Sequence, residues 1–388
     1  MTHGFISDGR LYVYREQAGV KEIESHFVRD KQERSERMTH SHGWKSQCNA
    51  EDPFYNSNVV WGRQSSAGLT TGYRFKDVIV PDENILYYTL SNGVVTGLFE
   101  YDLKDDFETR LFHKNDLISR GIDFSKKRGE FVLAVQDVDG RVNLELLNSR
   151  GSSTSILTGG DSRDCYPSFS QHNPNHVLFQ SAGIARDEEG YAMMYGPEAI
   201  YRYDSESEEL VEVLADEHYD FLLPREDAKG NLYCIRRPYQ LPGQTSLGKQ
   251  LLNALLFPVH FVSAVVGFLE AFTKLFNQQA FKANGPAVQS EQKDKYANVL
   301  GQTIHLAKLQ RNRSSKDPSL VPGSWELLCI SANKECKVIA RNVASYDIDN
   351  DGTLYFTNGY RVNSLTAENS TMLFKHNMIE FLKTSPVA

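Results

Sequence analysis

Short runs of alternating apolar and polar residues, separated by turn-forming residues, recur along most of the chain. The segment from Arg120 to Gly159 holds four such runs, divided by "KKRG", "DVDG" and "NSRGSS". Alternation with a period of two is typical of a half-buried β-strand, and Gly, Asp and Asn are the residues that hairpin turns use. The pattern therefore predicts antiparallel units of four strands each.

A shorter element, a turn of Gly, Asn or Asp followed by a β-rich run, occurs six times. Its runs are centred on Leu11, Leu86, Phe131, Val177, Leu232 and Leu354. The copies at Leu86, Phe131 and Val177 are separated by 45 and 46 residues, which is the length of a four-stranded propeller blade. The sequence predicts an all-β propeller of four-stranded blades, with six blades favoured and five or seven as alternatives.

The first copy differs from the others. "RLYVYREQAGVKEIESHF", residues 10–27, resembles an outer hairpin at least as well as an inner one. Sheet proteins must protect their edge strands, and strands from one terminus can complete a blade begun by the other. We expect the N-terminal strands to share a sheet with a strand from the other end of the chain.

One copy carries a family resemblance. "DCYPSFSQHNPNHVLFQSAG", Asp164 to Gly183, is similar to the repeat of TolB-type propellers, in which Pro-x-Trp/Phe-Ser precedes a turn and an apolar strand. Pro167, Phe169 and Ser170 match that pattern, whereas "QHNPN" replaces the usual Pro-Asp-Gly turn. The other copies keep only the turn and the strand. The resemblance implies a TolB-like, WD-repeat-like fold and no activity, because such propellers host many functions.

Two segments interrupt the β pattern of what we interpret as a single domain spanning 1–388. Residues 27–58 are polar and predict a partly helical or loop excursion. Residues 241–300 predict an inserted apolar helix or helical hairpin followed by a polar linker, placed within one blade. Pro258 divides or kinks that helix.

The insertion carries no charge from Gln250 to Leu269, a length that could span a membrane. A single crossing would place 323–342 on the opposite side of the bilayer from its partner strands. Since no second apolar run brings the chain back, a propeller excludes a simple span. Attachment to a membrane interface, docking of a protein partner or self-association, and packing on the propeller remain as alternatives.

The contact surface of the insertion is predicted within residues 246–276. Burying one large apolar side chain is worth roughly 1.5–3 kcal/mol, so a run of this kind needs a cover. Lys249, Lys274 and Lys282 flank the run and suit anionic headgroups. The candidate membrane or partner contacts are Leu251, Leu255, Phe257, Phe261, Val262, Val265, Phe268, Leu269, Phe272 and Phe276.

Composition narrows the function classes. A formal net charge of -8 argues against binding nucleic acid by bulk attraction, and we expect no nucleic-acid partner. The N-terminal residues lack the pattern of a secretory signal. The five cysteines are scattered without CxxC spacing, which indicates reduced thiols in a cytoplasmic protein. Peripheral attachment to a membrane is compatible with that location.

Catalytic signatures are lacking. The sequence contains no G-x-S-x-G elbow, no H-E-x-x-H, no P-loop and no G-x-G-x-x-G after a strand. Nothing in the sequence requires a cofactor or identifies a catalytic residue. A propeller hydrolase with a metal-assisted site on the central axis, covered by the insertion as a lid, is the alternative to a non-enzymatic protein.

Two stretches contain metal-ligand types of residue. "DIDNDG" places Asp347, Asp349 and Asp351 before a glycine, as at the start of a calcium loop, although Asn358 occupies the position of the expected Glu. We interpret this stretch as a tight β-turn in preference to a calcium loop. "THSHGWKSQC" places His40, His42 and Cys48 close together, but a zinc site needs three or four ligands. A solvated loop or short helix is favoured there.

The sequence therefore predicts a non-enzymatic cytoplasmic β-propeller that serves as a scaffold or interaction module. Its insertion would tether it to a membrane surface or a protein partner. The ligand, the partner and the oligomeric state are not determined by the residues.

Overall fold

The structure is a computed structural model that describes residues 1–47, 72–240, 296–300, 302–305, 318–366 and 369–386. The chain divides into two compact units. The first comprises Met1–Tyr239, Asn298–Ile304 and Lys308–Ala388, and the second comprises Gln240–Ala297 and His305–Ala307. The strands that concern the site all belong to the first unit.

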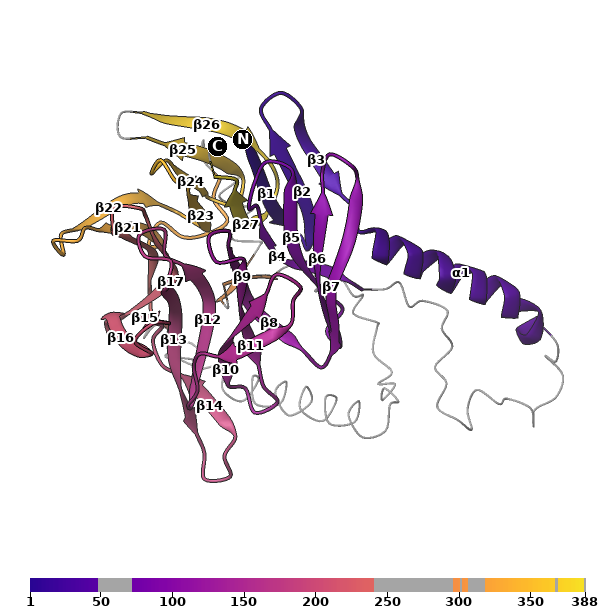
Figure 1. Cartoon of the computed structure of the whole chain (residues 1–388), viewed down its shortest axis with the longest axis horizontal. Coiled ribbons are helices and arrows are strands. Elements are labelled where there is room, and N and C mark those ends of the chain that lie inside the picture. The colour runs from indigo at the N-terminus through magenta and orange to yellow at the C-terminus, as the bar shows by residue number, and fades with distance from the viewer. Residues whose placement is uncertain (48–71, 241–295, 301, 306–317, 367–368, 387–388) are drawn as a thin grey trace, which may run out of the picture. The chain divides into compact units, whose positions relative to one another are not determined.

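Antiparallel four-stranded sets make up nearly all of the described chain (Figure 1). One sheet contains β4 (Arg74–Ile79), β5 (Ile85–Ser91), β6 (Val95–Asp102) and β7 (Phe107–Asn115) in sequence order. Another contains β23 (Ser345–Ile348), β24 (Leu354–Thr357), β25 (Arg361–Leu365) and β26 (Ser370–Lys375), also in order. Order along the chain and order in the sheet coincide, as in the predicted units.

A nine-stranded sheet holds two further sets. The first is β8 (Ile118–Ser125), β9 (Glu130–Gln136), β10 (Val142–Asn148) and β11 (Ser153–Ile156). The second is β12 (Ser162–Phe169), β13 (His176–Arg186), β15 (Ala199–Asp204) and β16 (Glu209–Leu214), and β14 (Ala192–Tyr195) pairs with the end of β13. A single parallel pair, Val142 with Arg163, joins the two sets. The sheet thus consists of two antiparallel units linked at one point.

The two ends of the chain share a sheet, as predicted. Its order is β27 (Ile379–Thr384), β1 (Thr2–Ser7), β2 (Arg10–Arg15) and β3 (Gly19–Ile23). His3 pairs with Thr384 across β1 and β27. The Leu11 copy of the repeat lies on β2, the third strand of its sheet, whereas β5, β9, β13, β18 and β24 carry the other copies as second strands. Of the two hairpin positions that the sequence left open, the N-terminal copy therefore occupies the outer one.

In the sequence, residues 241–295 separate two strands that are neighbours in one sheet. That sheet has the order β17 (Tyr219–Glu226), β18 (Leu232–Pro238), β21 (Glu326–Ile330) and β22 (Cys336–Arg341). β18 and β21 pair from Leu232–Ile330 to Arg236–Glu326. A separate hairpin pairs β19 (Tyr296–Val299) with β20 (Gln302–His305). The sheet is complete although its second and third strands are far apart in the sequence.

Four turns share the pattern Asp-x-x-Gly, and each begins at Asp137, Asp187, Asp227 or Asp349. In every case the glycine amide donates to the carbonyl of that aspartate, at 3.0–3.1 Å, and the aspartate amide bonds to the residue after the glycine. The glycines have φ between 81° and 88°, a region that residues with a Cβ rarely adopt. The sequence-predicted turns "DVDG" and "NDG" are confirmed by these bonds.

The apolar core lies between neighbouring sheets. One cluster joins Leu98 of β6 to Phe131 of β9, and another joins Leu144 of β10 to Phe179 of β13. A third includes Leu178 and Leu328, and a fourth includes Phe5 and Val362. Each cluster draws residues from two neighbouring four-stranded sets, which is the packing that a propeller requires.

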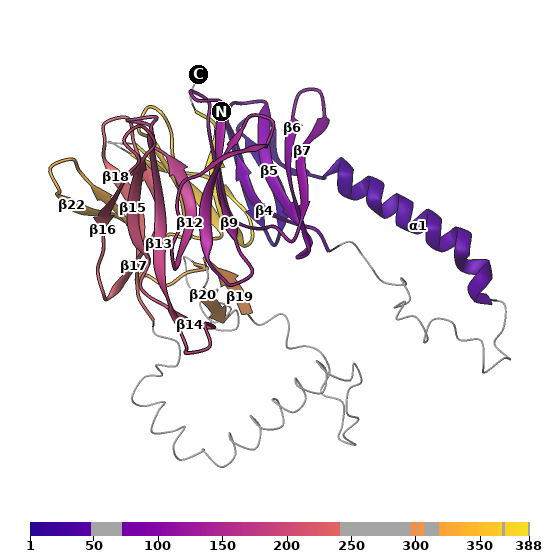
Figure 2. The ribbon, with the colours of Figure 1, turned by 60° about the horizontal axis from the view of Figure 1, so that its bottom comes forward.

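The first strands of the sheets contact one another in sequence. The contacts run from β4 to β8, β12, β17, β23 and β27, and β27 contacts β4 again. These six strands are called the inner strands below. The architecture is that of a β-propeller, and Figure 2 shows the sheets standing side by side.

One long helix accompanies the sheets. α1 (His26–Gln47) begins beside β7, where Glu108 accepts hydrogen bonds from the amides of His26 (2.6 Å) and Phe27 (3.3 Å). The first amides of a helix have no partner within the helix, and a carboxylate there also suits the helix dipole. Among the described residues, no helix is both long and apolar enough to cross a membrane.

Candidate functional site

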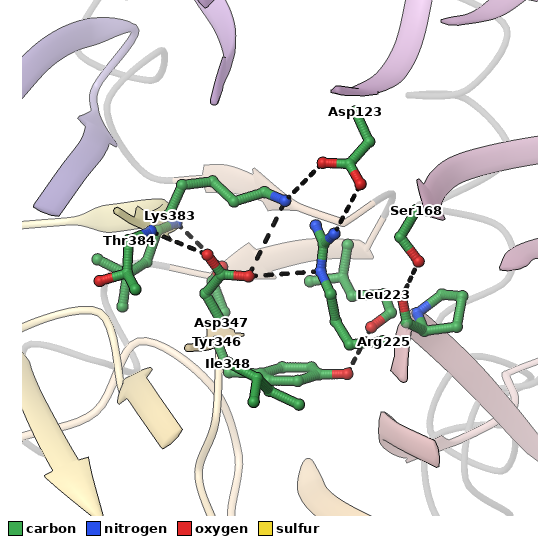
Figure 3. A network of polar contacts seen from close by, with 12 residues as sticks. Asp123, Ser168, Leu223, Arg225, Tyr346, Asp347, Ile348, Lys383 and Thr384 are labelled. Atoms are coloured by element: carbon green, nitrogen blue, oxygen red, sulfur yellow. Dashed lines mark hydrogen bonds and ion pairs between the residues drawn. The ribbon is translucent and has the colours of Figure 1, made fainter. Parts of the chain in front are cut away.

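Two carboxylates and two cations from four different inner strands meet where those strands converge (Figure 3). Asp123 lies on β8, Arg225 on β17, Asp347 on β23 and Lys383 on β27. The Lys383 Nζ is 3.1 Å from Asp123 Oδ1 and 3.9 Å from Asp347 Oδ1. Arg225 Nη1 is 3.3 Å from Asp123 Oδ2, and its Nε is 3.5 Å from Asp347 Oδ1. Each anion thus contacts both cations, and we call these four residues the inner-strand charge cluster.

The cluster is buried and electrically balanced. The Lys383 side chain is 5% exposed and that of Arg225 is 15% exposed. Burial by itself would raise the pKa of Asp123, but Lys383 and Arg225 together hold that pKa below its ordinary value. Burial would likewise lower the pKa of Arg225, yet Asp123 and Asp347 raise it. Asp123 and Arg225 therefore stay charged at neutral pH because each has a partner of opposite sign.

Hydrogen bonds connect the same inner strands around the cluster. The Phe169 amide of β12 donates to Asp123 Oδ2 at 3.0 Å, and the Thr384 amide donates to Asp347 Oδ2 at 2.8 Å. The Tyr346 hydroxyl donates to the Leu223 carbonyl at 2.6 Å. Side chains on one four-stranded set thus bond the backbone of another, which fixes these sets relative to each other.

The inner strands can accept these bonds because several of them contain a β-bulge. In β17 the register with β18 jumps between Leu222 and Arg225, and Leu223 has a φ of 53°. A bulge takes backbone groups out of the ladder. Side chains satisfy them here, since Gln180 accepts from the Leu223 amide and Ser168 donates to the Pro224 carbonyl. Sequence alternation gives no sign of such bulges.

The donor set of the cluster is poorly suited to a divalent cation. A metal would have to displace Arg225 or Lys383 from carboxylates that both of them neutralise. Within the described part of the chain, no group of three or more His, Cys, Asp or Glu is arranged to hold a metal ion. The two carboxylates and the two cations neutralise one another and connect four inner strands.

The carboxylates of "DIDNDG" have separate roles. Asp347 belongs to the inner-strand charge cluster. Asp349 begins the β-turn that links β23 to β24, and Asp351 accepts the Thr353 amide at 2.8 Å within that turn. The β-turn interpretation is confirmed by these bonds, and calcium binding by the three aspartates stays a hypothesis.

The remaining predicted site residues have side chains that lie outside the described part of the chain. His40 and His42 lie on α1, where only the backbone is described. Cys48 and the apolar residues of the insertion lie outside the described residues. A zinc site at the histidines and contacts through the insertion therefore remain predictions.

A cavity opens between the turns that join β17 to β18 and β23 to β24. Its volume is about 230 Å³, and its wall includes Asp227, Lys229, Tyr233 and Asp351. Asp227 is buried and accepts hydrogen bonds from the Lys229 and Asn231 amides, both at 2.9 Å. The Asp227 carboxylate is thus engaged in holding the turn. Among the lining residues named here, the cavity is a polar recess whose buried carboxylate already has hydrogen-bond partners.

A second buried polar group lies where the chain leaves β18. Arg237 donates from Nε to Asp220 Oδ2 at 2.8 Å and from Nη1 to the Leu300 carbonyl at 3.0 Å. Its guanidinium also stacks on Trp325, 5.0 Å from the ring centroid. Arg237 thus binds the chain on both sides of residues 241–295.

The sequence carries a recurring feature that indicates the charge cluster. An aspartate occurs in five inner strands, at Asp77, Asp123, Asp164, Asp220 and Asp347, and β27 has Lys383 instead. All six residues are buried. Charged residues are rarely buried without a partner, so a charge repeated in successive apolar strands points to a shared polar centre. Which charges pair with each other is visible only in the structure.

The fold of the chain is similar to that of several solved structures. No family model matches the chain, and no curated protein matches it. The structure of TolB from Acinetobacter baumannii has a TM-score of 0.50 at 9% identity, over 100% of this chain and 66% of that one. A chain of the nidogen/laminin complex gives 0.49 at 9% identity, with both chains fully covered. Tricorn protease gives 0.46 at 11% identity, over 96% of this chain and 33% of that one.

These similarities concern the fold. The chain spans about two thirds of the length of that TolB and a third of tricorn protease. At such identities a structural match defines architecture and not activity. The predicted resemblance to TolB-like β-propellers is confirmed at the level of the fold.

Proposed function

We propose that this protein is a non-catalytic β-propeller of six blades that serves as a scaffold or interaction module. Residues 246–276 of its insertion would attach it to a membrane surface. The observation that carries the proposal is the pairing of β18 with β21. In the sequence, an uncharged run of 20 residues, Gln250 to Leu269, therefore separates two strands that pair directly with each other.

Six blades agree with the order of the inner strands. The six four-stranded sets each begin with one of β4, β8, β12, β17, β23 and β27, and these strands contact one another in a cycle. In the proposed ring, β27 joins β1 to complete the last blade. The ion pairs of the inner-strand charge cluster would then stabilise the contacts between blades at the centre of the ring.

The charge cluster supports a scaffold over a hydrolase. A metal-assisted site on the axis needs carboxylates that are free to bind a cation. Asp123 and Asp347 instead contact Arg225 and Lys383. This arrangement holds strands together, which is a structural role.

The chemistry of the insertion favours an interface of lipids. Its apolar run is flanked by Lys249, Lys274 and Lys282, which suits the boundary between acyl chains and anionic headgroups. A sheet completed on both sides of the insertion is compatible with peripheral attachment. Buried Cys165 and Cys234 are free thiols, which agrees with a location on the cytoplasmic side.

Liposome flotation tests the attachment. The full chain is compared with a variant in which a Gly–Ser linker of equal length replaces 246–282, so that β18 and β21 stay connected. We expect the full chain to float with vesicles containing anionic lipid and the linker variant to stay in the soluble fraction. Replacing Phe261 and Phe268 by Asp should abolish flotation, and replacing the three lysines by Gln should weaken it on anionic vesicles only.

Other outcomes separate the alternatives. Equal recovery of both chains in the soluble fraction, with the full chain monomeric in size-exclusion chromatography, contradicts both membrane attachment and self-association. A soluble oligomer that the linker variant loses would assign the insertion to protein contacts. A stoichiometric divalent metal in the purified protein, lost on Asp123→Asn, would favour the hydrolase.

A further inference from the structure

A second apolar surface lies on the described residues, away from the insertion's own sequence. The hairpin of β13 and β14 extends past its sheet (Figures 1 and 2) and exposes Tyr191 (70%) and Met193 (68%). In the turn between β9 and β10, Val138 is 99% exposed. Isolated apolar residues are ordinary on a protein surface, but adjoining ones mark interaction sites. We call Val138, Tyr191 and Met193 the hairpin patch.

One arginine connects the two turns that carry the patch. Arg186 Nη1 donates to the Asp139 carbonyl at 3.1 Å and to the Gly190 carbonyl at 2.9 Å. These carbonyls belong to the residues next to Val138 and Tyr191, so the two turns are held against each other by one nitrogen atom. The turns come from different four-stranded sets, and their contact is a product of the tertiary structure.

The backbone beneath the patch is also held by an ion pair of Arg186. Arg186 Nε lies 2.7 Å and 2.9 Å from the two carboxylate oxygens of Asp161, and its side chain is only 18% exposed. The ladder between β13 and β14 skips Met193, because Ala185 pairs with Met194 and Arg186 with Ala192. Bulges re-aim side chains and often occur beside functional sites. A preorganised surface loses less conformational entropy when a partner binds.

Acidic residues surround the patch. The two turns and the start of β12 contribute six carboxylates and two guanidinium groups. Asp137, Asp139, Asp161, Asp187, Glu188 and Glu189 are the carboxylates, and Arg141 and Arg186 carry the guanidinium groups. Arg141 pairs with Asp139, and Arg186 pairs with Asp161, so the rim keeps a net negative charge. Such a rim repels anionic lipid and attracts a cationic partner.

From this geometry we propose that the hairpin patch is a docking surface for a protein segment in which apolar side chains are interspersed with Lys or Arg. The apolar side chains contact Tyr191, Met193 and Val138. The cationic side chains pair with Glu188 and Glu189, whose carboxylates lie at the rim. Methionine adapts its shape to different apolar groups, so the surface accepts a class of segments with this chemistry.

Fluorescence anisotropy with synthetic peptides tests the proposal on the full chain. The probe is a labelled twelve-residue peptide of alternating Leu and Lys, and the controls alternate Leu with Glu and Ser with Lys. We expect the Leu–Lys peptide to bind at least tenfold more tightly than either control. The variants Tyr191→Ser/Met193→Ser and Glu188→Lys/Glu189→Lys should each weaken binding at least tenfold. Met372→Ser removes an apolar residue of β26 that is 53% exposed, and it should have no effect.

Four results of the binding and flotation measurements would overturn the proposal. The first is that the patch variants bind the Leu–Lys peptide as tightly as the parent chain, and the second is that the Ser–Lys peptide binds as tightly as the Leu–Lys peptide. The third is that flotation with vesicles depends on the patch residues. The fourth is that the Leu–Lys peptide binds tenfold more tightly to the chain in which a linker replaces residues 246–282. The last result would mean that the insertion itself occupies the patch. A photo-crosslinking side chain at position 138, in an otherwise unchanged chain, gives a readout that does not depend on the folding of the variants. It should capture the Leu–Lys peptide, and its failure to do so contradicts the proposal.

Discussion

The ammonium group of Lys383 lies 3.1 Å from the carboxylate of Asp123, although 260 residues separate the two in the sequence. Lys383 belongs to β27, which pairs with the N-terminal strand β1, and Asp123 belongs to β8. The ion pair therefore joins the sheet made from both ends of the chain to a sheet from its middle. With Asp347 and Arg225 it forms the polar centre of the inner strands.

Removing Lys383 should destabilise the protein strongly. Lys383→Met leaves Asp123 and Asp347 with one cation between them, and breaking a buried ion pair typically costs about 3–5 kcal/mol. The free energy of unfolding, measured with urea, reports this loss. Lys104→Met, at an exposed position of a turn, should change it by less than about 0.5 kcal/mol. A Lys383 variant as stable as the parent would contradict a fastening role for the cluster.

Tyr346→Phe should cost about 1–3 kcal/mol of unfolding free energy. The substitution removes the hydroxyl that bonds the Leu223 carbonyl, and Tyr346 is almost fully buried. The buried Leu223 carbonyl, left without its partner, then carries a desolvation penalty. Tyr191→Phe, at a residue that is 70% exposed, is the matched control and should leave thermal and urea unfolding unchanged.

His3 should make the protein less stable as the pH falls below neutrality. Burial, followed by the nearby N-terminal charge, lowers the pKa of His3 from 6.5 to about 4. The unfolded chain then binds a proton between pH 6.5 and 4 that the folded chain does not bind. Stability is therefore complete above pH 6.5 and decreases toward pH 4, by up to about 3 kcal/mol.

The titration of His3 can be isolated by substitution. His3→Gln removes the titrating group while keeping a side chain that can bond Thr384, the partner of His3. The decrease between pH 6.5 and 4 should become smaller in this variant. His218→Gln, at a side chain that is 75% exposed, should keep the parent profile. An unchanged slope for the His3 variant would show that other groups cause the decrease.

The cysteines should differ sharply in their reaction with thiol reagents. Burial raises the pKa of the Cys165 and Cys234 thiols, and both are inaccessible in the core. Cys336 is exposed. In a Cys48→Ser background, a disulfide reagent should modify Cys336 within minutes and reach Cys165 and Cys234 only when the protein unfolds. Rapid modification of Cys234 in the folded protein would contradict the packing described.

The sequence determined the local elements and their class. Alternating runs around Asp-x-x-Gly turns fix hairpins, because only a few residues can adopt the required backbone angles. Repetition of those hairpins at about one blade length was enough to predict an all-β propeller, and the outer hairpin at Leu11 was visible in the same pattern. The uncharged run from Gln250 to Leu269 could also be recognised from the sequence, because it is defined by the composition of one continuous segment.

Only the tertiary structure decided how distant charges combine. Lys383, Arg225, Asp123 and Asp347 are each one charge in an apolar strand, and their pairing depends on which strands become neighbours around the centre. The same is true of the hairpin patch, where Arg186 joins two turns of different strand sets. Local sequence encodes backbone conformation within a few residues, whereas ion pairs and surface patches arise from positions in space. For this protein the sequence therefore specified the blades, and the packing of the blades created the sites.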